Sequence, residues 1–225
     1  MTRNFREIDT WLFDLDETLY PPSLALFDQI HEKMTAFVMA ELSLDHDAAS
    51  ALRDEYYHAY GTTLAGLMRQ HNMDPFPYLH DVHDIDLSHV EEEPDLTAAI
   101  AALPGRKIIY TNGSLSHAEQ VAKARGIDHL FDAMYGVEHA DFIPKPERAA
   151  FESIFDKAAI TPAQTAFFED TVKNLREPAA MGLATVLVRN GVDTPDFVHL
   201  HRDHLLDALS HIHETLSQSS AENLL

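Results

Sequence analysis

The feature that most constrains the fold of this chain is a series of short apolar runs, each of which is followed by polar residues. The runs have the composition of buried parallel strands and occupy residues 10–13, 107–110, 132–135, 165–168 and 184–188. The last four each follow a helix-like segment, so strand and helix alternate from about residue 95 onward. This alternation predicts an α/β fold with a doubly wound parallel sheet built from right-handed crossovers.

The stretch between the first and second runs has a different pattern. Its apolar residues recur at helical spacing, first in Leu24, Phe27, Met34, Phe37 and Val38 and then near residues 47–60, 62–71 and 75–82. Prolines and a run of glutamates interrupt the pattern at residues 21–22 and 91–94, as linkers would. We therefore predict a catalytic core of residues 1–18 and 95–225, with a helical domain of residues 19–94 inserted after the first strand.

Two carboxylates, Asp14 and Asp16, follow the first predicted strand directly. Residues at i and i+2 leave a strand on the same side, so both side chains can approach one ligand. Adjacent anions cost energy unless a cation or a shared proton compensates, and oxygen ligands suit a hard ion such as Mg²⁺. One aspartate could also act as a nucleophile, and the other could then act as a general acid and base. A turn with two exposed acids is the alternative for this motif taken alone.

Three further polar motifs follow later predicted strands. Thr111, Asn112 and the glycine and serine after them could form an anion cradle before a helix, or an ordinary loop with a helix cap. Lys145 stands between two prolines and could point at an anion, or lie on the surface. Glu169 and Asp170 could supply further metal ligands or acids at a helix N-terminus. The recurrence of such motifs at strand ends favours a joint site, since ligands of doubly wound sheets bind there.

Composition narrows the classes of partner. With 16 basic and 37 acidic residues the formal charge is −21, which argues against binding to nucleic-acid polymers or to anionic membranes. The chain has no cysteine, which excludes thiolate catalysis and disulfides. The amino terminus lacks an apolar signal region, and no apolar run approaches the roughly 18 residues of a membrane helix. We expect a cytoplasmic protein, either a monomer or a homodimer.

In their order and spacing, the four motifs resemble those of the haloacid dehalogenase superfamily across almost the full chain. The resemblance implies a Rossmann-like core with an α-helical C1 cap between the first and second motifs. It implies that Asp14 is the nucleophile and Asp16 the general acid and base. Mg²⁺ would be held by Asp14, the Asp16 backbone carbonyl and Asp170, with Glu169 supporting the site.

The same resemblance implies how phosphate is bound. Thr111, the backbone of Asn112 and Lys145 would hold the transferring phosphoryl group, and Asn174 would lie behind the metal ligands. Family dehalogenases lack an acid two positions after the nucleophile, so Asp16 indicates a phosphatase or phosphomutase.

Segments outside these motifs, residues 60–67, 78–86, 104–113 and 115–131 among them, resemble the pyrimidine 5′-nucleotidase branch. Glu169 departs from that branch, where Asp is more usual. The cap would have to supply the contacts to the substrate's organic part. The candidates are Tyr20, Tyr56, Tyr60, Arg69, His71, His80 and His83, each of which could instead serve in packing or on the surface.

We therefore expect an Mg²⁺-dependent phosphomonoester hydrolase that forms an aspartyl-phosphate and acts on a small phosphorylated metabolite, specifically a nucleoside monophosphate. A phosphomutase or a sugar-phosphate phosphatase is the alternative of the same class. A non-catalytic phosphate-binding or interaction protein is the alternative of another class, because fold alone does not fix function.

Overall fold

A six-stranded, entirely parallel sheet forms the centre of the molecule. The computed structural model describes residues 3–222, so residues 1–2 and 223–225 of the predicted core lie outside the described residues. The strand order is β3-β2-β1-β4-β5-β6, which is doubly wound from β1 as the alternation predicts. The strands are β1 (Thr10–Phe13), β2 (Arg106–Tyr110), β3 (Ala133–Tyr135), β4 (Thr165–Glu169), β5 (Ala184–Val188) and β6 (Leu200–Arg202).

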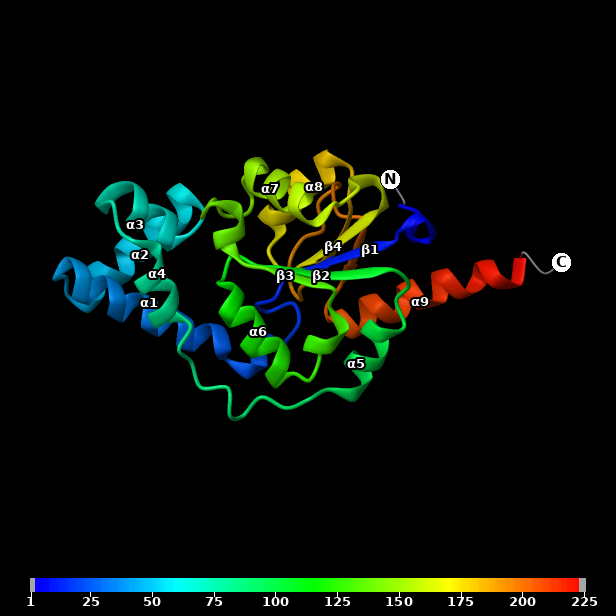
Figure 1. Cartoon of the computed structure of the whole chain (residues 1–225), viewed down its shortest axis with the longest axis horizontal. Helices are drawn as coiled ribbons and strands as arrows, with labels where there is room; N and C mark the ends of the chain where they lie inside the picture. Colours follow the sequence, from blue (N-terminus) through cyan, green and yellow to red (C-terminus); the bar gives the residue numbers. More distant parts are fainter. Residues whose placement is uncertain (1–2, 223–225) are drawn as a thin grey trace.

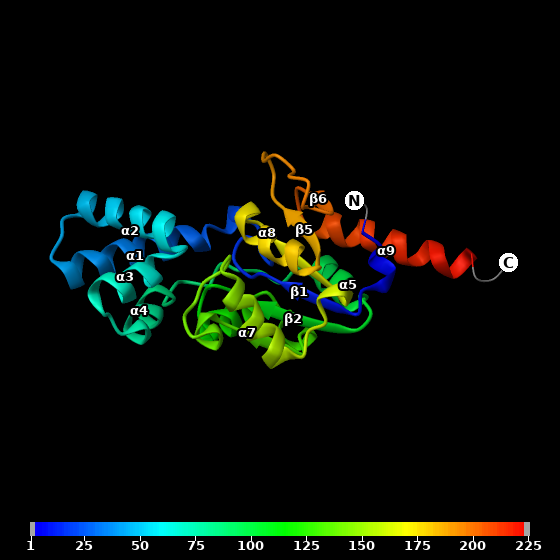
Figure 2. The ribbon, with the colours of Figure 1, turned by 90° about the horizontal axis from the view of Figure 1, so that it is seen from above.

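Helices cover both faces of the sheet and give three layers (Figures 1 and 2). One face carries α5 (Pro94–Ala101), α6 (Leu115–Ala124) and α9 (Leu205–Glu222), and the other carries α7 (Arg148–Ala158) and α8 (Val172–Met181). Short 3₁₀ helices lie in the connections at Phe5–Glu7, Pro22–Leu24, Asp128–Leu130, Val137–Ala140 and Pro162–Gln164. The expected α/β fold class is confirmed.

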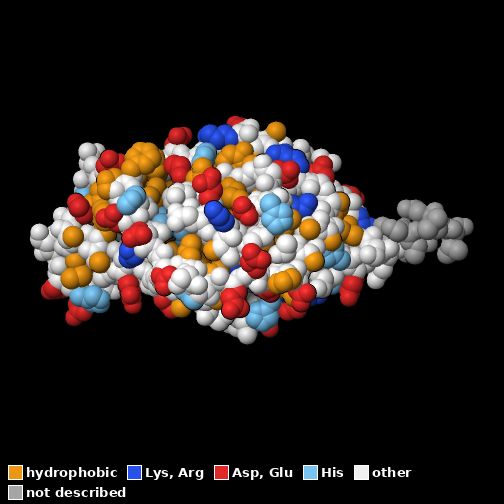
Figure 3. Space-filling model, turned by 60° about the horizontal axis from the view of Figure 1, so that its bottom comes forward, with side chains coloured by type: hydrophobic (Ala, Val, Ile, Leu, Met, Phe, Trp, Pro, Cys, Tyr) orange, Lys and Arg blue, Asp and Glu red, His pale blue; other side chains and the backbone are white. Residues whose placement is uncertain are grey.

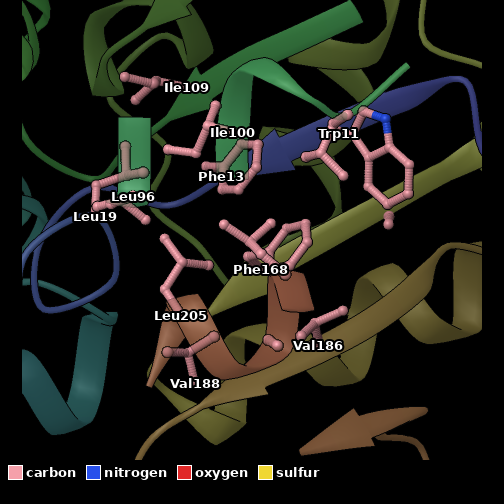
Figure 4. Packing of buried hydrophobic residues seen from close by; sticks show 14 of the residues in the cluster. Trp11, Phe13, Leu19, Leu96, Ile100, Ile109, Phe168, Val186, Val188 and Leu205 are labelled. Carbon is pink, nitrogen blue, oxygen red and sulfur yellow. The ribbon is translucent and has the colours of Figure 1, made fainter. Parts of the chain in front are cut away.

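The central strands are buried on both faces, which explains why they read as unbroken apolar runs. Phe13 of β1 stacks on Phe168 of β4 with ring centroids 4.5 Å apart, and Trp11 packs nearby (Figure 4). Leu12 and Phe167 point to the opposite face and pack against α7 and α8. Close packing on both faces fixes the positions of the strand ends, where the polar motifs begin.

Four helices form a separate bundle at one end of the sheet (Figure 1). They are α1 (Leu26–Leu42), α2 (His46–Tyr60), α3 (Thr63–His71) and α4 (Pro75–Val82), and we call them the helical insertion. Asp45, Thr62 and Asp74 accept backbone N–H bonds as the N-caps of its last three helices. Phe37 and Tyr78 belong to the insertion's apolar cluster, which also takes in Val137 from outside these helices.

The helical insertion is joined to the rest of the chain by α1 itself. Leu26, at the start of α1, belongs to the core cluster beside the sheet, whereas Val38, three turns later, belongs to the insertion's cluster. The return connection, residues 83–93, runs past α6 to α5 (Figure 1).

Acidic side chains are spread over the face in Figure 3 instead of gathering in one patch, so the large negative charge marks no single binding surface there. Among the described helices, none combines the length and the apolar character that a membrane span requires.

Candidate active site

The polar motifs meet at the carboxyl ends of the three central strands. Asp14 follows β1, Thr111 follows β2 and Glu169 ends β4. These strands are direct neighbours in the order β2-β1-β4, so their ends lie side by side. Lys145 reaches the same place from the loop before α7 and is 1% exposed. Residues that are far apart in the sequence thus form a single buried cluster.

Lys145 occupies the middle of this cluster. Its Nζ donates to Asp14 Oδ1 at 2.6 Å, to Glu169 Oε2 at 2.8 Å and to the Tyr110 carbonyl at 3.2 Å. These contacts use all three ammonium protons, so a contact from Lys145 to a phosphoryl oxygen requires one of them to be given up. Burial opposes the charged form, but Asp14 and Glu169 more than offset it and raise the pKa of Lys145 above its ordinary value.

Carboxylates outnumber this buried ammonium. Burial, together with the charge of Glu169, raises the pKa of Asp14 to about 8 despite the attraction of Lys145. Burial and the charge of Asp170 likewise raise the pKa of Glu169 to about 7, and burial and Asp14 raise that of Asp170 to about 6. Oxygen atoms of Asp14, Glu169 and Asp170 lie within 4.8 Å of one another. A divalent cation would balance the excess charge and let all three ionise.

Two further residues, Asn174 and Arg189, lie near the same predicted cation position. Asn174 Oδ1 is buried at the cavity and has no hydrogen-bond partner among the residues described, which leaves a hard oxygen for a cation or its water. Arg189, at the end of β5, places Nη1 2.7 Å from Asp170 Oδ2 and 3.8 Å from Glu17. Buried carboxylates and an unpaired amide oxygen form a donor set that fits Mg²⁺.

Asp16 lies beside the cluster and has separate partners. His117 Nε2 is 2.7 Å from its Oδ1, and the Tyr20 hydroxyl donates to the same oxygen at 2.8 Å. The Thr111 hydroxyl lies 3.4 Å from the other oxygen, Oδ2. Burial alone would raise the pKa of Asp16, but His117, with contributions from His83 and Tyr20, lowers it to about 2. Without a cation, the pKa values of Asp14 and Asp16 are therefore shifted in opposite directions.

The loop after β2 is held to the Lys145 loop through Asn112. The Asn112 side chain accepts from the Lys145 backbone N–H at 2.8 Å and donates to the Lys145 carbonyl at 3.3 Å. The amide oxygen and one amide N–H of Asn112 therefore hold the two loops together. The Thr111 hydroxyl accepts from the Gly113 N–H at 2.9 Å, which turns it toward Asp16.

A cavity of about 620 Å³ opens above these residues and extends beneath the helical insertion. Its floor is made by Asp14, Asp16, Thr111, Lys145 and Asp170. Residues from the insertion that form its walls include Phe27, Ile30, His31, Met34, Arg53, Asp54, Tyr57 and Leu79. This volume is in the usual range for a site that encloses a small organic ligand.

The structure sorts the candidates named for the insertion. His83 lines the cavity and is 9% exposed. His80 has an 84% exposed side chain next to Asp81, and Tyr60 pairs with Gln70, so neither lines the cavity. Helical periodicity placed His80 and His83 on one face, but His83 is the C-cap residue of α4 and departs from that spacing.

Other candidates serve elsewhere. The Tyr56 hydroxyl pairs with His71, and Arg69 lies over the Tyr60 ring, so both contacts are internal to the insertion. Tyr20 touches Asp16 directly.

Sequence reasoning missed several residues that the fold brings to the site. His117, Arg189, His31, Arg53 and Asp54 were given no role. Arg189 does carry a signal, because it directly follows β5, and His117 lies in the first turn of the helix that follows β2. The three residues of α1 and α2 carry none, because only the packing of the insertion determines which helix faces turn toward the cavity.

Comparisons with known proteins agree with this geometry. The model of the haloacid dehalogenase-like hydrolase family matches residues 8–182. Phosphate metabolism protein 8 of Saccharomyces cerevisiae is 26% identical over 193 residues, which cover 79% of this chain and 60% of the yeast protein. The chain thus spans about three fifths of the length of that relative. A glyceraldehyde 3-phosphate phosphatase of Methanopyrus kandleri is 24% identical over 225 residues, covering 88% of this chain and 95% of the relative.

Solved structures share the fold at lower identity. The HAD-hydrolase YfnB of Bacillus subtilis, bound to magnesium, has a TM-score of 0.61 at 14% identity and covers 91% of this chain and 98% of its own. A HAD phosphatase from Thermococcus onnurineus has a TM-score of 0.60 at 15% identity with the same coverage. The L-2-haloacid dehalogenase of Xanthobacter autotrophicus has a TM-score of 0.57 at 15% identity, covering 92% and 98%. With its parallel sheet, its buried acidic cluster and a family match over most of its length, the chain belongs to the haloacid dehalogenase-like hydrolases.

Proposed function

We propose that this protein is an Mg²⁺-dependent phosphomonoester hydrolase that uses Asp14 as its nucleophile. The observation that carries the proposal is the pairing of two aspartates with different surroundings at the end of β1. Asp14 lies among Lys145, Glu169 and Asp170, whereas Asp16 is bonded to His117 and Tyr20. The ammonium and the cation position beside Asp14 suit an anionic nucleophile, and the separate partners of Asp16 suit a proton-transferring group.

The chain's own residues account for the first step. An oxygen of Asp14 attacks phosphorus in line with the ester oxygen, while Thr111 and Lys145 stabilise charge on the phosphoryl oxygens. The Asp16 carboxyl protonates the departing alcohol oxygen as its bond to phosphorus breaks. A phosphoryl dianion beside Asp16 raises the pKa of this carboxyl, which favours the protonated form that this step needs.

The second step reverses the role of Asp16. Its carboxylate takes a proton from a water molecule, and the water oxygen attacks phosphorus and displaces Asp14. Inorganic phosphate leaves, and both aspartates return to their starting states.

Asp14, Asp170 and the Asp16 backbone carbonyl would hold Mg²⁺, with Glu169 and Asn174 in support. The ion supplies charge neutralisation at the phosphoryl oxygens. The buried oxygen atoms of Asp14, Glu169 and Asp170 and the unpartnered Asn174 Oδ1 support this assignment.

We further propose a nucleoside monophosphate as substrate, with residues 19–94 acting as a cap that recognises its organic part. The cavity pairs apolar walls at Phe27 and Met34 with hydrogen-bonding groups at His31, Arg53 and Asp54, a combination that suits a planar polar base. The two curated relatives are named for phosphate metabolism and for a phosphatase acting on a phosphorylated triose. Their names support a small phosphorylated substrate and leave its organic part to experiment.

A release assay for inorganic phosphate tests the proposal. The purified protein is incubated with UMP, CMP, AMP, GMP, glucose 6-phosphate and glyceraldehyde 3-phosphate, in Mg²⁺ and in EDTA, with Asp14→Asn as the matched control. We expect phosphate release that requires Mg²⁺ and is lost in the variant, with a nucleotide as the best substrate. Rearranged sugar phosphate without free phosphate would identify a mutase, and turnover by Asp14→Asn at the wild-type rate would refute the nucleophile.

A further inference from the structure

His117 is a buried histidine of α6 that contacts the reaction centre without belonging to any of the four motifs. It is 1% exposed, and its Nε2 lies 2.7 Å from Asp16 Oδ1. Because the ionised carboxylate only accepts hydrogen bonds, Nε2 is the nitrogen that donates. Its Nδ1 is buried and has no partner among the described residues. Among the described residues, the side-chain hydrogen bond of this ring is therefore to Asp16, which marks His117 as a residue serving that carboxylate.

One face of the His117 ring contacts the helical insertion. His83, at the C-terminus of α4, stacks on His117 with ring centroids 4.4 Å apart and an interplanar angle of 14°. His83 Nδ1 lies 3.0 Å from the hydroxyl of Ser114, which is the N-cap of α6. Gly113 leaves room for the pair, because a Cβ there would lie 3.1 Å from His117 Cδ2 and 3.4 Å from His83 Nε2. The insertion thus touches a direct partner of Asp16.

The hydrogen bonds distinguish the two oxygens of Asp16. Oδ1 receives both His117 Nε2 and the Tyr20 hydroxyl, which fills its usual accepting capacity. Oδ2 has the Thr111 hydroxyl at 3.4 Å and so faces the predicted phosphoryl site. Two donors on one oxygen fix the rotation of the carboxyl group and leave the other oxygen to exchange a proton.

We propose that His117 is a positioning residue that holds Asp16 with Oδ2 toward the ester oxygen, and that His83 makes this positioning depend on the placement of the helical insertion. The inference rests on the proposed function, because it assigns a task to the general acid and base of that reaction. It adds a contact by which closure of the insertion over a substrate would complete the catalytic arrangement. No change in the protonation of His117 is required.

The test compares two aryl phosphates, p-nitrophenyl phosphate and phenyl phosphate, by kcat/KM, which reports the first phosphoryl transfer. The p-nitrophenolate group leaves readily without a proton, whereas phenolate needs one far more. His117→Phe retains a ring for stacking but loses the donor. We expect kcat/KM for phenyl phosphate to fall by on the order of 10²-fold, the lower end of general acid catalysis. The value for p-nitrophenyl phosphate should change about tenfold less than that.

Further variants separate positioning from folding. His117→Gln restores an N–H donor and should recover part of the phenyl phosphate activity. His83→Ala should show the same preference for the better leaving group to a smaller degree. His129→Phe and His46→Ala, at exposed histidines in the core and the insertion, are the matched controls and should behave as wild type.

A measurement that needs no turnover completes the test. In ¹⁵N-histidine spectra of the Mg²⁺-free protein, the Nε2–H of His117 should give a downfield proton signal that is lost in Asp16→Asn. If the signal is present but wild type releases no phosphate from any ester, the proposed function fails while the contact stands. Equal losses for both aryl phosphates in folded His117→Phe, or no loss, would overturn the positioning role. If His117→Phe does not fold, two other results remain decisive. A His83→Ala variant that discriminates between the two aryl phosphates as wild type does would overturn the dependence on the helical insertion. Absence of the His117 Nε2–H signal from wild type would overturn the contact with Asp16.

Discussion

Replacing Lys145 by methionine should destabilise the protein strongly, because Lys145 carries the positive charge at the centre of a buried acidic cluster. The side chain is 1% exposed and lies 2.6 and 2.8 Å from the carboxylates of Asp14 and Glu169. Methionine has a similar volume, so the change removes charge more than packing. Breaking a buried ion pair by removing one partner costs about 3–5 kcal/mol. For a chain of this length that corresponds to a fall in Tm of about 6–20 °C.

The stability lost on replacing Lys145 by methionine should depend on pH in a definite direction. The pKa values of Asp14 and Glu169 in the folded protein are about 8 and about 7, above the ordinary values of 3.8 and 4.5. Once these carboxyls are protonated in the folded state they no longer attract the ammonium of Lys145. The difference in the free energy of unfolding between wild type and Lys145→Met is therefore largest above pH 8. It becomes smaller as the pH falls through the pKa values of Asp14 and Glu169 in the folded protein.

Thermal and urea unfolding of EDTA-treated protein measures this difference, with Lys123→Met as control. Lys123 is exposed on α6, and its replacement should change the free energy of unfolding by less than about 0.5 kcal/mol. Mg²⁺ should return part of the stability lost in Lys145→Met, because a divalent ion also compensates the carboxylates. A loss below about 1 kcal/mol at pH 8, or one that grows on acidification, would refute the charge balance described for this cluster.

Three further predictions follow from the same residues. Asp14→Asn should unfold at a higher temperature than wild type in EDTA, because it removes one of the crowded carboxylates, and should lose Mg²⁺-induced stabilisation; equal stabilisation of both proteins by Mg²⁺ would exclude Asp14 as a ligand. Asp16→Asn should release one equivalent of p-nitrophenolate rapidly and then turn over on the order of 10²–10⁴-fold more slowly, since only the second step needs its base; stopped-flow absorbance without a burst would contradict this order of events. Gly61→Ala should cost about 1–2 kcal/mol in urea unfolding, because Gly61 has φ +89° and a Cβ would lie 3.2 Å from Pro144 Cγ; an unchanged midpoint would show that this contact can relax.

Much of the core was predictable because its signals are local. Buried parallel strands read as apolar runs, and the acids at their carboxyl ends identify the site, as Asp14 and Glu169 do. Strand β6 was missed because it has only three residues, two of them His201 and Arg202, and carries no apolar run.

The walls of the cavity were less predictable, because they depend on packing between distant elements. His83 and His117 are 34 positions apart and stack only because the end of α4 meets the start of α6. Tyr20 was considered as a substrate contact but bonds to Asp16, a distinction that requires the conformation of the turn between them. Periodicity ranks residues by helix face and gives no information on which face an inserted helix turns to the core.

The central claim is that Asp14 forms a covalent bond to phosphorus during turnover. Rapid mixing of the Mg²⁺-loaded Asp16→Asn variant with p-nitrophenyl phosphate, followed by borohydride reduction and mass spectrometry, tests it most directly. Reduction of an aspartyl-phosphate yields homoserine, so we predict homoserine at position 14, dependent on substrate and absent from the Asp14→Asn/Asp16→Asn double variant. An unmodified Asp14 in a sample that has released one equivalent of p-nitrophenolate would contradict the account. Homoserine at position 170 instead of position 14 would also contradict it.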